Sequence, residues 1–477
     1  MPKYMLKIKV IHLYIALFLV NCLVSFVVFV VPFYFFDSIT WNTPTFRFLS
    51  FLISLVIISI IDFKVLYGRF INVRPSASFA YMFDDGPWFH FIDDPRTSIV
   101  INWITKESTY GFIEFGDSID TMKEFILEEK DKIHRKSFIN LIPDKVYYYR
   151  IQHLERVYSF KTAPEMSDHV MVAVIGDTQN GGGLGDPNWS FPKIADAIKR
   201  ESKLDVLLHV GDLTDQGNDL RSWHAYFASA KDILSKVPMF VAVGNHDTGT
   251  NHMHDKEMKK YPDEGANFDY FLGYKYSVPE TESQTTSFRG RYYSFDYENC
   301  HFIMLDSQNS KLANPENPQW KFIKNDLTSV PRQMWKIACI HRDIIDIQRT
   351  QTGEITYRYD RFSPYVCPLL HKYGVDVVFQ GHDHVFQVLS WKYTENKTIY
   401  SNIGEIMKLE IPYITTGGAG NELRKNQRIE IESKDVDSGI ITENSSHYLI
   451  ADFCKEICEI TAKYHDGSIL YRFSIRK

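Results

Sequence analysis

Five short apolar runs in this chain each end beside residues that commonly bind metal ions. The runs cover residues 171–175, 206–210, 240–243, 337–340 and 375–379. The motifs that follow them are Gly176-Asp177-Thr178-Gln179, Gly211-Asp212-Leu213-Thr214-Asp215, Gly244-Asn245-His246-Asp247, His341-Arg342 and Gly381-His382-Asp383-His384. Short β-branched runs suit strands buried on both faces, and ligands bind beyond the carboxyl ends of such strands in open sheets. We therefore expect five separate segments to meet at one crevice.

The donor atoms in these motifs favour transition metals. They comprise two aspartates, one asparagine and three histidines with no thiolate, namely Asp177, Asp212, Asn245, His341, His382 and His384. Such donors suit zinc, iron or manganese rather than calcium. Two divalent or mixed-valence ions about 3.5–4 Å apart, bridged by Asp212, would hold a hydroxide and clamp the attacking and leaving oxygens of a displacement at phosphorus. The motifs therefore predict the hydrolysis of phosphate esters.

The motifs resemble those of the calcineurin-like metallophosphoesterases, and in particular those of the purple acid phosphatases. The resemblance covers most of residues 72–477 and includes Arg291-Tyr-Tyr-Ser-Phe-Asp-Tyr297, His301-Phe-Ile-Met-Leu-Asp306, Gln319-Trp320, Asn325-Asp326-Leu327 and Pro412-Tyr-Ile-Thr-Thr-Gly-Gly418. It implies a four-layer α+β or α/β fold, in which two packed mixed sheets are flanked by helices.

The resemblance also implies a role for each site residue. The first metal would be bound by Asp177, Asp212 and His384, and the second by Asp212, Asn245, His341 and His382. His246 would contact the phosphate or protonate the leaving group, and Asn245 would also lie against the substrate. We group Asp247 with the catalytic residues Asp212 and His246, and we expect it to orient its neighbours, as we do Asp383.

Two positions depart from the family patterns. Purple acid phosphatases have a tyrosine three residues after the bridging aspartate, where this chain has Asp215. We therefore expect no tyrosinate-to-iron charge transfer. Asp215 either orients a ligand through its carboxylate or is a turn residue. Other metallophosphoesterases have a histidine where this chain has Gln179, so we expect its amide oxygen to be a weak, neutral metal ligand.

Several other polar residues lie near the motifs. We expect His209, which lies inside an apolar run, to be a core histidine, and we interpret His224, His301 and His371 in the same way. His252, His254 and Asp255 are expected in a surface loop rather than against the substrate. Asp343 and Arg349 either help to bind phosphate, which suits a guanidinium, or lie on the surface.

Composition is consistent with a multidomain enzyme. The 477 residues are 44% hydrophobic and 23% charged, which suffices for two or more domains and membrane segments. The formal net charge of −6 argues against a nucleic-acid binder with a basic face, so a small phosphorylated substrate is the expected partner. The six cysteines lack the spacing of a disulfide framework. Nothing in the sequence predicts the oligomeric state.

The first 70 residues predict a transmembrane hairpin. Residues 10–36 are almost wholly apolar and long enough to cross a bilayer, and residues 45–61 are a shorter second candidate. Basic residues flank both outer ends, namely Lys3, Lys7, Lys9, Lys64, Arg69 and Arg74. The positive-inside rule therefore predicts a membrane protein with a cytoplasmic catalytic domain. An extracytoplasmic domain, which is the habit of the purple acid phosphatases, is the alternative if only one segment spans.

Two further domains follow this hairpin. Residues 72–165 contain short alternating runs, such as 98–103 and 111–115, separated by turn signals, which predict a β-sandwich. This region resembles the fibronectin-III-like module of plant-type purple acid phosphatases, and residues 168–477 would form the catalytic domain. We expect a membrane-anchored phosphatase that prefers monoesters, a preference implied by the resemblance alone. The alternatives are a phosphodiesterase of the same superfamily and a catalytically silent, phosphate-sensing membrane module.

Overall fold

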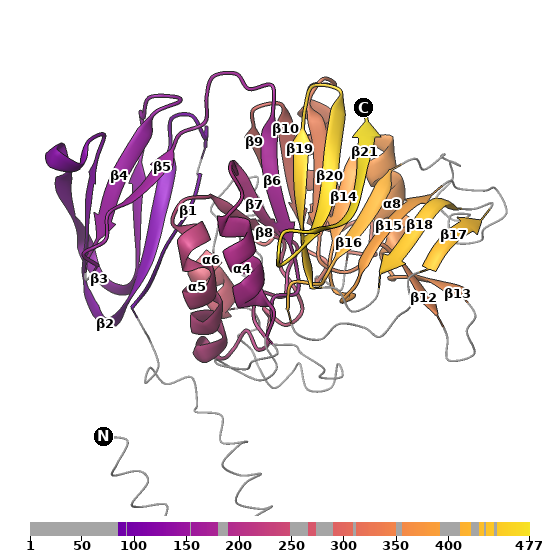
Figure 1. Ribbon diagram of the computed structural model, residues 1–477, viewed down its shortest axis with the longest axis horizontal. Helices are drawn as coiled ribbons and strands as arrows, with labels where there is room; N and C mark the ends of the chain where they lie inside the picture. The colour runs from indigo at the N-terminus through magenta and orange to yellow at the C-terminus, as the bar shows by residue number, and fades with distance from the viewer. Residues whose placement is uncertain are drawn as a thin grey trace, which may run out of the picture. The chain divides into compact units, whose positions relative to one another are not determined.

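The computed structural model describes most of the chain from residue 84 onwards (Figure 1). The described residues are 84–91, 93–152, 154–179, 189–248, 266–272, 290–308, 312–349, 355–391, 411–420, 429–433, 436–442 and 446–477. All of them belong to one unit of the chain, Phe79–Lys477. The expected transmembrane hairpin at residues 1–70 and the loop that contains His252 lie outside the described residues. None of the helices described here is long and apolar enough to span a bilayer.

The N-terminal part of the unit is a five-stranded antiparallel sheet. Its strands are β1 (Asp85–His90), β2 (Ile99–Gly116), β3 (Lys123–Phe138), β4 (Val146–Ile151) and β5 (Tyr158–Lys161), with a 3₁₀ turn, η2 (Ile119–Thr121), before β3. Strand β2 pairs with β3 along one edge and with β1 and β4 along the other. Aromatic rings fill its core. The rings of Phe115 and Phe138 stack, with their centroids 3.7 Å apart. The aromatic residues of this region therefore serve packing.

One expectation for this region is wrong. The runs at residues 98–103 and 111–115 were expected to be separate strands, but both lie in the single strand β2. The polar residues 106–109 between them look like a turn in the sequence. In the structure they lie at an irregularity in the pairing of β2 with β3, between Ile104 and Thr109. An irregularity of this kind bends a strand without ending it.

A six-stranded mixed sheet carries the first three motifs. Its strands, in spatial order, are β21 (Ile469–Arg476), β20 (Ile457–Tyr464), β19 (His447–Phe453), β6 (Val170–Ile175), β7 (Val206–His209) and β8 (Met239–Val241). Strands β6, β7 and β8 are parallel, whereas β19 pairs with β6 in the antiparallel sense. Helices α4 (Phe191–Lys199) and α5 (Leu220–Leu234) contact each other and belong to the core of this sheet, and α6 (Ala266–Leu272) lies later in the chain.

An eight-stranded mixed sheet carries the last two motifs. In spatial order it contains β17 (Ile429–Ser433), β18 (Val436–Thr442), β15 (Phe386–Trp391), β16 (Pro412–Thr416), β14 (Val377–Gln380), β11 (Trp335–Ile340), β10 (Cys300–Leu305) and β9 (Tyr293–Tyr297). Strands β10, β11, β14 and β16 are parallel. The hairpin β12 (Ile345–Arg349) and β13 (Ile355–Tyr359) forms a separate small sheet. Helices α7 (Pro318–Ser329) and α8 (Ser363–Lys372) complete this half.

Two cores hold these elements in layers. One core joins α4 and α5 to the six-stranded sheet and that sheet to the eight-stranded one, and includes Ile194, Leu208 and Ile337. The other joins the eight-stranded sheet to α7 and α8, and includes Phe322 and Leu370. The expectation of two packed mixed sheets flanked by helices is therefore confirmed (Figure 1).

Candidate metal centre

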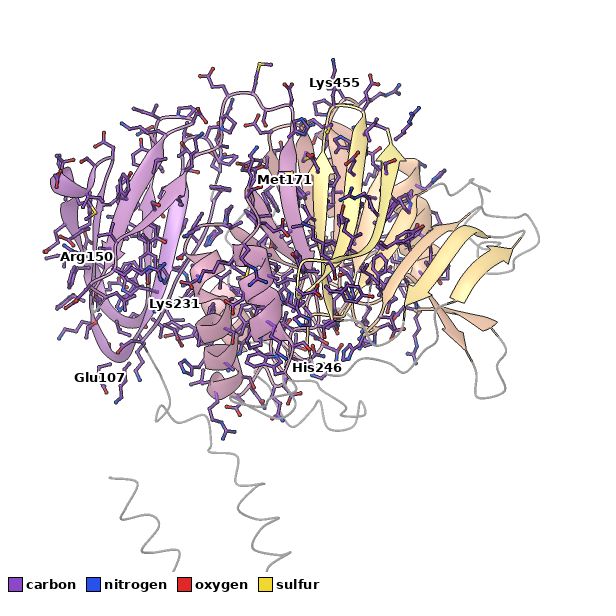
Figure 2. The ribbon with its side chains drawn as sticks, viewed as in Figure 1. Glu107, Arg150, Met171, Lys231, His246 and Lys455 are labelled. Atoms are coloured by element: carbon purple, nitrogen blue, oxygen red, sulfur yellow. The ribbon has the colours of Figure 1, made fainter. Side chains whose placement is uncertain are left out.

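The five motifs lie at the carboxyl ends of parallel strands. Three follow β6, β7 and β8 of one sheet, and two follow β11 and β14 of the other. Ligand atoms of Asp212, His341 and His382 lie within 4.8 Å of one another. These three residues come from both sheets, so the packing of the sheets assembles the cluster. Figure 2 shows His246 at this edge of the molecule.

Asp212 and His341 form the centre of this cluster. Asp212 Oδ2 lies 3.2 Å from His341 Nε2, and Asn245 Oδ1 lies 3.0 Å from the same nitrogen. The other ring nitrogen, Nδ1, donates to the carbonyl of Val210 at 2.9 Å. This bond orients the ring with Nε2 towards the oxygen donors, as is usual for a histidine that binds a metal.

The charges in the cluster favour a cation. Burial alone would lower the pKa of His341, but the Asp212 carboxylate outweighs it and raises this pKa to about 9. Burial would raise the pKa of Asp212, but the imidazoles of His341 and His246 outweigh it and hold this pKa below its usual value. The two groups therefore stabilise each other's charged forms, and metals bind such donors by displacing protons. The donor set fits a transition metal.

Asp177, Gln179 and His384 form a neighbouring group. Asp177 Oδ1 lies 3.5 Å from His384 Nε2, and both carboxylate oxygens accept from the backbone nitrogen of His382, at 3.1 and 3.0 Å. In the orientation that suits its neighbours, the Gln179 amide oxygen lies 3.0 Å from His384 Nε2. Its nitrogen then donates to the carbonyls of Asp177 and Asp212, at 3.1 and 3.2 Å. The amide is thus held with its oxygen on the side of His384.

The backbone is strained at three of the proposed ligands. Asp177, Asp212 and His382 have φ angles of 57°, 55° and 69°, which non-glycine residues rarely adopt. Each such residue costs about 1–3 kcal/mol and persists only where surrounding structure enforces it. Gly244 packs directly against Asp212, because a Cβ at Gly244 would overlap the side chain and backbone of Asp212. Three of the six described non-glycine residues with a positive φ are therefore proposed ligands, and the other three are Asn140, Asp144 and Glu298.

Asp247 is a positioning residue. Its buried carboxylate accepts from the backbone nitrogens of Asp212 at 2.9 Å, Leu213 at 2.8 Å, Thr214 at 3.2 Å and Gly244 at 2.9 Å. These bonds tie the loop after β7 to the loop after β8. The orienting role expected of Asp247 fits this geometry, and its grouping with Asp212 and His246 as a catalytic residue stays a prediction.

His246 lies beside the bridging carboxylate. Its backbone nitrogen donates to Asp212 Oδ1 at 2.8 Å, and its Nε2 lies 3.8 Å from Asp212 Oδ2. Its Nδ1 donates to the backbone carbonyl of Asp215 at 2.9 Å, and the Asp215 carboxylate lies 3.8 Å from the same nitrogen. The acceptor that orients His246 is thus the backbone carbonyl of Asp215, and the two interpretations of the Asp215 carboxylate both stay predictions.

The remaining histidines divide into two kinds. His209 is a fully buried core residue, as expected, because Nδ1 accepts from the Gly211 backbone nitrogen and Nε2 donates to Thr178 Oγ1. Burial lowers the pKa of His209 to about 3, so its ring is neutral. His301 is also buried, but it pairs with two carboxylates. The expectation is wrong for His224 and His371, which are only half-buried.

Asp343 does not lie on the surface. It is 4% exposed, and its Oδ1 accepts from Thr415 Oγ1 at 3.1 Å. The prediction for Arg349 concerns a side chain outside the described part of the structure. Sequence reasoning missed the carbonyls of Val210 and Asp215, which orient His341 and His246. Backbone acceptors of this kind leave no signal in the residue types.

Comparisons with known proteins bear on the family and the fold. Residues 170–386 match the family described as calcineurin-like phosphoesterase. Purple acid phosphatase 22 of Arabidopsis thaliana is 28% identical over 336 residues, which cover 69% of this chain and 68% of that protein. Probable inactive purple acid phosphatase 24 of the same plant is 27% identical over 320 residues, 61% of this chain and 49% of that protein. The purple acid phosphatase PPD1 from yellow lupin (Lupinus luteus) seeds has a similar fold, with a TM-score of 0.62 and 20% identity, covering 82% of this chain and 74% of that one.

Proposed function

Because this chain is a metal-dependent phosphoesterase whose calcineurin-like domain has purple acid phosphatase relatives, we propose that it hydrolyses phosphate monoesters at a dinuclear metal centre. The observation that carries the proposal is the convergence of Asp212, His341 and His382 from two sheets, with ligand atoms within 4.8 Å. The proposed substrate is a small phosphorylated molecule, since the formal net charge of −6 does not favour nucleic acid.

The proposed ligands fall into two sets that share Asp212. Asp177, Gln179 and His384 complete the first set, and Asn245, His341 and His382 complete the second. Zinc, iron and manganese suit these oxygen and nitrogen donors. Gln179 is a neutral ligand and Asp215 stands where a tyrosine would bind ferric iron, so divalent ions are favoured and no purple colour is expected.

The chain's own residues would orient the ester and move the proton. Bound ions would supply a nucleophilic hydroxide at neutral pH and offset charge on the phosphoryl oxygens. His246 would act as the general acid, because Nδ1 is held by the Asp215 carbonyl and Nε2 lies near the shared carboxylate, 3.8 Å from Asp212 Oδ2. Asn245, 8% exposed, would contact the phosphate from the same loop.

The N-terminal part supports a proposal about location. We infer that residues 1–70 anchor the enzyme in a membrane, and that the five-stranded sheet before the catalytic domain is fibronectin-III-like. The basic residues that flank both outer ends of the apolar segment favour a cytoplasmic catalytic domain. Protease treatment of sealed membrane vesicles tests the proposed topology. A cytoplasmic catalytic domain should be cleaved when the cytoplasmic face of the vesicle is outermost, and an extracytoplasmic domain only when the opposite face is outermost.

Metal content and ester turnover, measured on the full-length protein, test the proposed activity. The monoester and the diester of 4-nitrophenol are compared with and without a chelator, and bound metals are counted by elemental analysis. We expect about two metals per chain, faster turnover of the monoester, and loss of turnover with the chelator. Chelator-insensitive turnover would exclude the mechanism. A protein that holds two metals but cleaves neither ester would support the phosphate-sensing alternative, to which the relative named probable inactive also points.

The variant His246→Gln tests the proposed general acid. Glutamine can still bind the phosphate but cannot donate a proton as imidazolium, so turnover should fall about 100-fold or more. Metal content should remain at the wild-type value. The fall in turnover should be smaller for an ester whose leaving group is more acidic, because such a group departs without being protonated. His371→Gln on α8 is the matched control and should turn over normally.

A further inference from the structure

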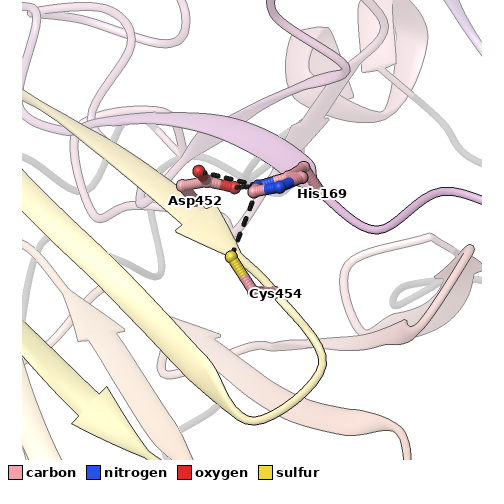
Figure 3. Close-up of side chains that lie close together, drawn as sticks. All are labelled: His169, Asp452 and Cys454. Atoms are coloured by element: carbon pink, nitrogen blue, oxygen red, sulfur yellow. Dashed lines mark hydrogen bonds and ion pairs between the residues drawn. The ribbon is translucent and has the colours of Figure 1, made fainter.

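A second group of metal-binding side chains lies at the opposite end of β6. His169, Asp452 and Cys454 offer ligand atoms that all lie within 4.8 Å of one another (Figure 3). His169 Nδ1 is 3.0 and 3.1 Å from the two oxygens of Asp452, and 3.3 Å from Cys454 Sγ. The three groups are a borderline nitrogen, a hard oxygen and a soft sulfur.

Strand pairing brings these residues together from distant parts of the chain. His169 comes directly before β6, Asp452 lies near the end of β19, and Cys454 comes directly after that strand. The two strands are antiparallel neighbours, with Asp452 opposite Met171 and Phe453 opposite Val170. Figure 2 shows Met171 and Lys455 towards the edge opposite the one where His246 lies. The cluster is therefore separate from the catalytic centre.

The geometry does not suit a proton relay from thiol through imidazole to carboxylate. A relay of that kind uses both ring nitrogens, one for the nucleophile and one for the acid that orients it. Here the thiol and the carboxylate both lie against the same atom, His169 Nδ1. Three donors that converge on one point instead fit a shared cation.

We propose that His169, Asp452 and Cys454 bind a zinc ion. Zinc takes thiolate, imidazole and carboxylate ligands in tetrahedral geometry, with donor atoms about 3.4–3.6 Å apart. The observed separations of 3.0 and 3.3 Å need only a small outward rotation to reach that spacing. A cavity of about 450 Å³ adjoins the cluster and is also lined by Glu456 and Glu459. It leaves room for water or one of these carboxylates as the fourth ligand.

A zinc ion at this position would join β6 to β19 where β6 begins. The other end of β6 leads to Asp177 of the catalytic centre, so the ion would fix the strand that carries this ligand. The His169 side chain is 56% exposed, and that of Asp452 is 27% exposed. Ions at the site should therefore exchange with those in solution, unlike those of a fully buried structural site.

Cobalt substitution tests this site separately from the catalytic one. Co²⁺ bound to a thiolate shows a sulfur-to-metal charge-transfer band in the near ultraviolet, and the catalytic donors include no sulfur. We expect the band when the full-length protein is titrated with Co²⁺, and we expect Zn²⁺ to remove it. Cys454→Ser and His169→Gln should abolish the band and lower the bound metal by one equivalent per chain.

Two controls test whether the band depends on Cys454 and His169 and whether the variants are folded. His465→Gln changes another exposed histidine and should leave the band intact. The visible bands of Co²⁺ at the catalytic centre should be unchanged in Cys454→Ser, which shows that the variant is folded. Among the described cysteines, Cys300, Cys339, Cys367 and Cys458 are buried, whereas Cys454 is half-buried. A band that persists in Cys454→Ser, or no band when the catalytic centre is filled, overturns the proposal.

Discussion

The two ends of the parallel strands in this molecule carry the same kinds of side chain in opposite settings. At the carboxyl ends, Asp212 and His341 are 1% and 0% exposed, and Asp212 has a positive φ angle. At the amino end of β6, the His169 side chain is 56% exposed, and none of His169, Asp452 and Cys454 has a positive φ. The first set is held rigidly before a metal arrives, and the second can adjust to one.

This difference separates catalysis from simple metal binding. A catalytic site gains from donors that are already in place, because reorganisation during the reaction adds to the barrier. That preorganisation costs about 1–3 kcal/mol for each strained residue. Metal binding alone needs no such strain. Variants at the carboxyl ends should therefore affect turnover strongly, and variants at the amino ends should not.

Asp212→Ala should have the largest effect on turnover. It removes the carboxylate proposed to hold both ions, and a loss of several kcal/mol of transition-state stabilisation slows the reaction about 1000-fold. Monoester turnover and metal content both measure this loss. Asp168→Ala, at an exposed residue just before the amino end of β6, is the matched control and should keep turnover within about twofold. A slowing of less than tenfold for Asp212→Ala would argue against its bridging role.

Asp247→Asn should have an intermediate effect on turnover. The amide keeps one acceptor oxygen but presents a donor to backbone nitrogens that themselves donate. We expect turnover to fall about 10–100-fold, as for other residues that orient metal ligands. The free energy of unfolding should fall by about 3 kcal/mol in urea denaturation, because bonds to a charged acceptor are lost.

Asp219→Asn is the control for this variant. Asp219 caps α5 by accepting from the Arg221 backbone nitrogen at 2.9 Å, and asparagine caps helices about as well. Its free energy of unfolding should change by less than about 0.5 kcal/mol. Equal losses in the two variants would mean that Asp247 contributes only charge, and not the specific bonds that tie the two loops.

Gln179→Ala should have a smaller effect on turnover. The change removes a neutral ligand and the bonds that its amide makes to the carbonyls of Asp177 and Asp212. We expect turnover at saturating metal to fall by less than about tenfold and the metal affinity of one site to fall about 10–100-fold. Gln179→His restores a stronger donor and should retain metal more tightly than the wild type. Unchanged metal retention in both variants would remove Gln179 from the ligands.

The sequence predicted the candidate metal ligands more fully than the contacts that orient them. Asp177, Asp212 and His382 each follow an apolar run, and parallel strands bring their carboxyl ends to one edge, so convergence follows from the order of residues. The contacts that orient these ligands depend on backbone atoms and on tertiary packing. The carbonyl of Asp215 orients His246 whatever residue stands there, so its identity is uninformative. The continuity of β2 was missed because the polar residues that bend it resemble a turn.

His301→Gln should alter stability and leave turnover unchanged. His301 lies near the amino end of β10, with Nδ1 at 2.7 Å from Asp296 and Nε2 at 2.8 Å from Asp326. Burial alone would lower its pKa, but the two carboxylates outweigh it and raise the pKa to about 9. Since the folded pKa exceeds the unfolded value, the added stability is complete below about pH 6.5 and is lost as the pH rises through 9.

Urea denaturation at several pH values measures this contribution. The wild type should exceed His301→Gln by at most about 3 kcal/mol at pH 6, and the gap should narrow steadily between about pH 6.5 and 9. Monoester turnover should be the same in both proteins at each pH. A gap that does not change with pH would mean that His301 acts through packing and not through its charge. A change in turnover would instead mean that the amino ends of these strands are coupled to the catalytic edge.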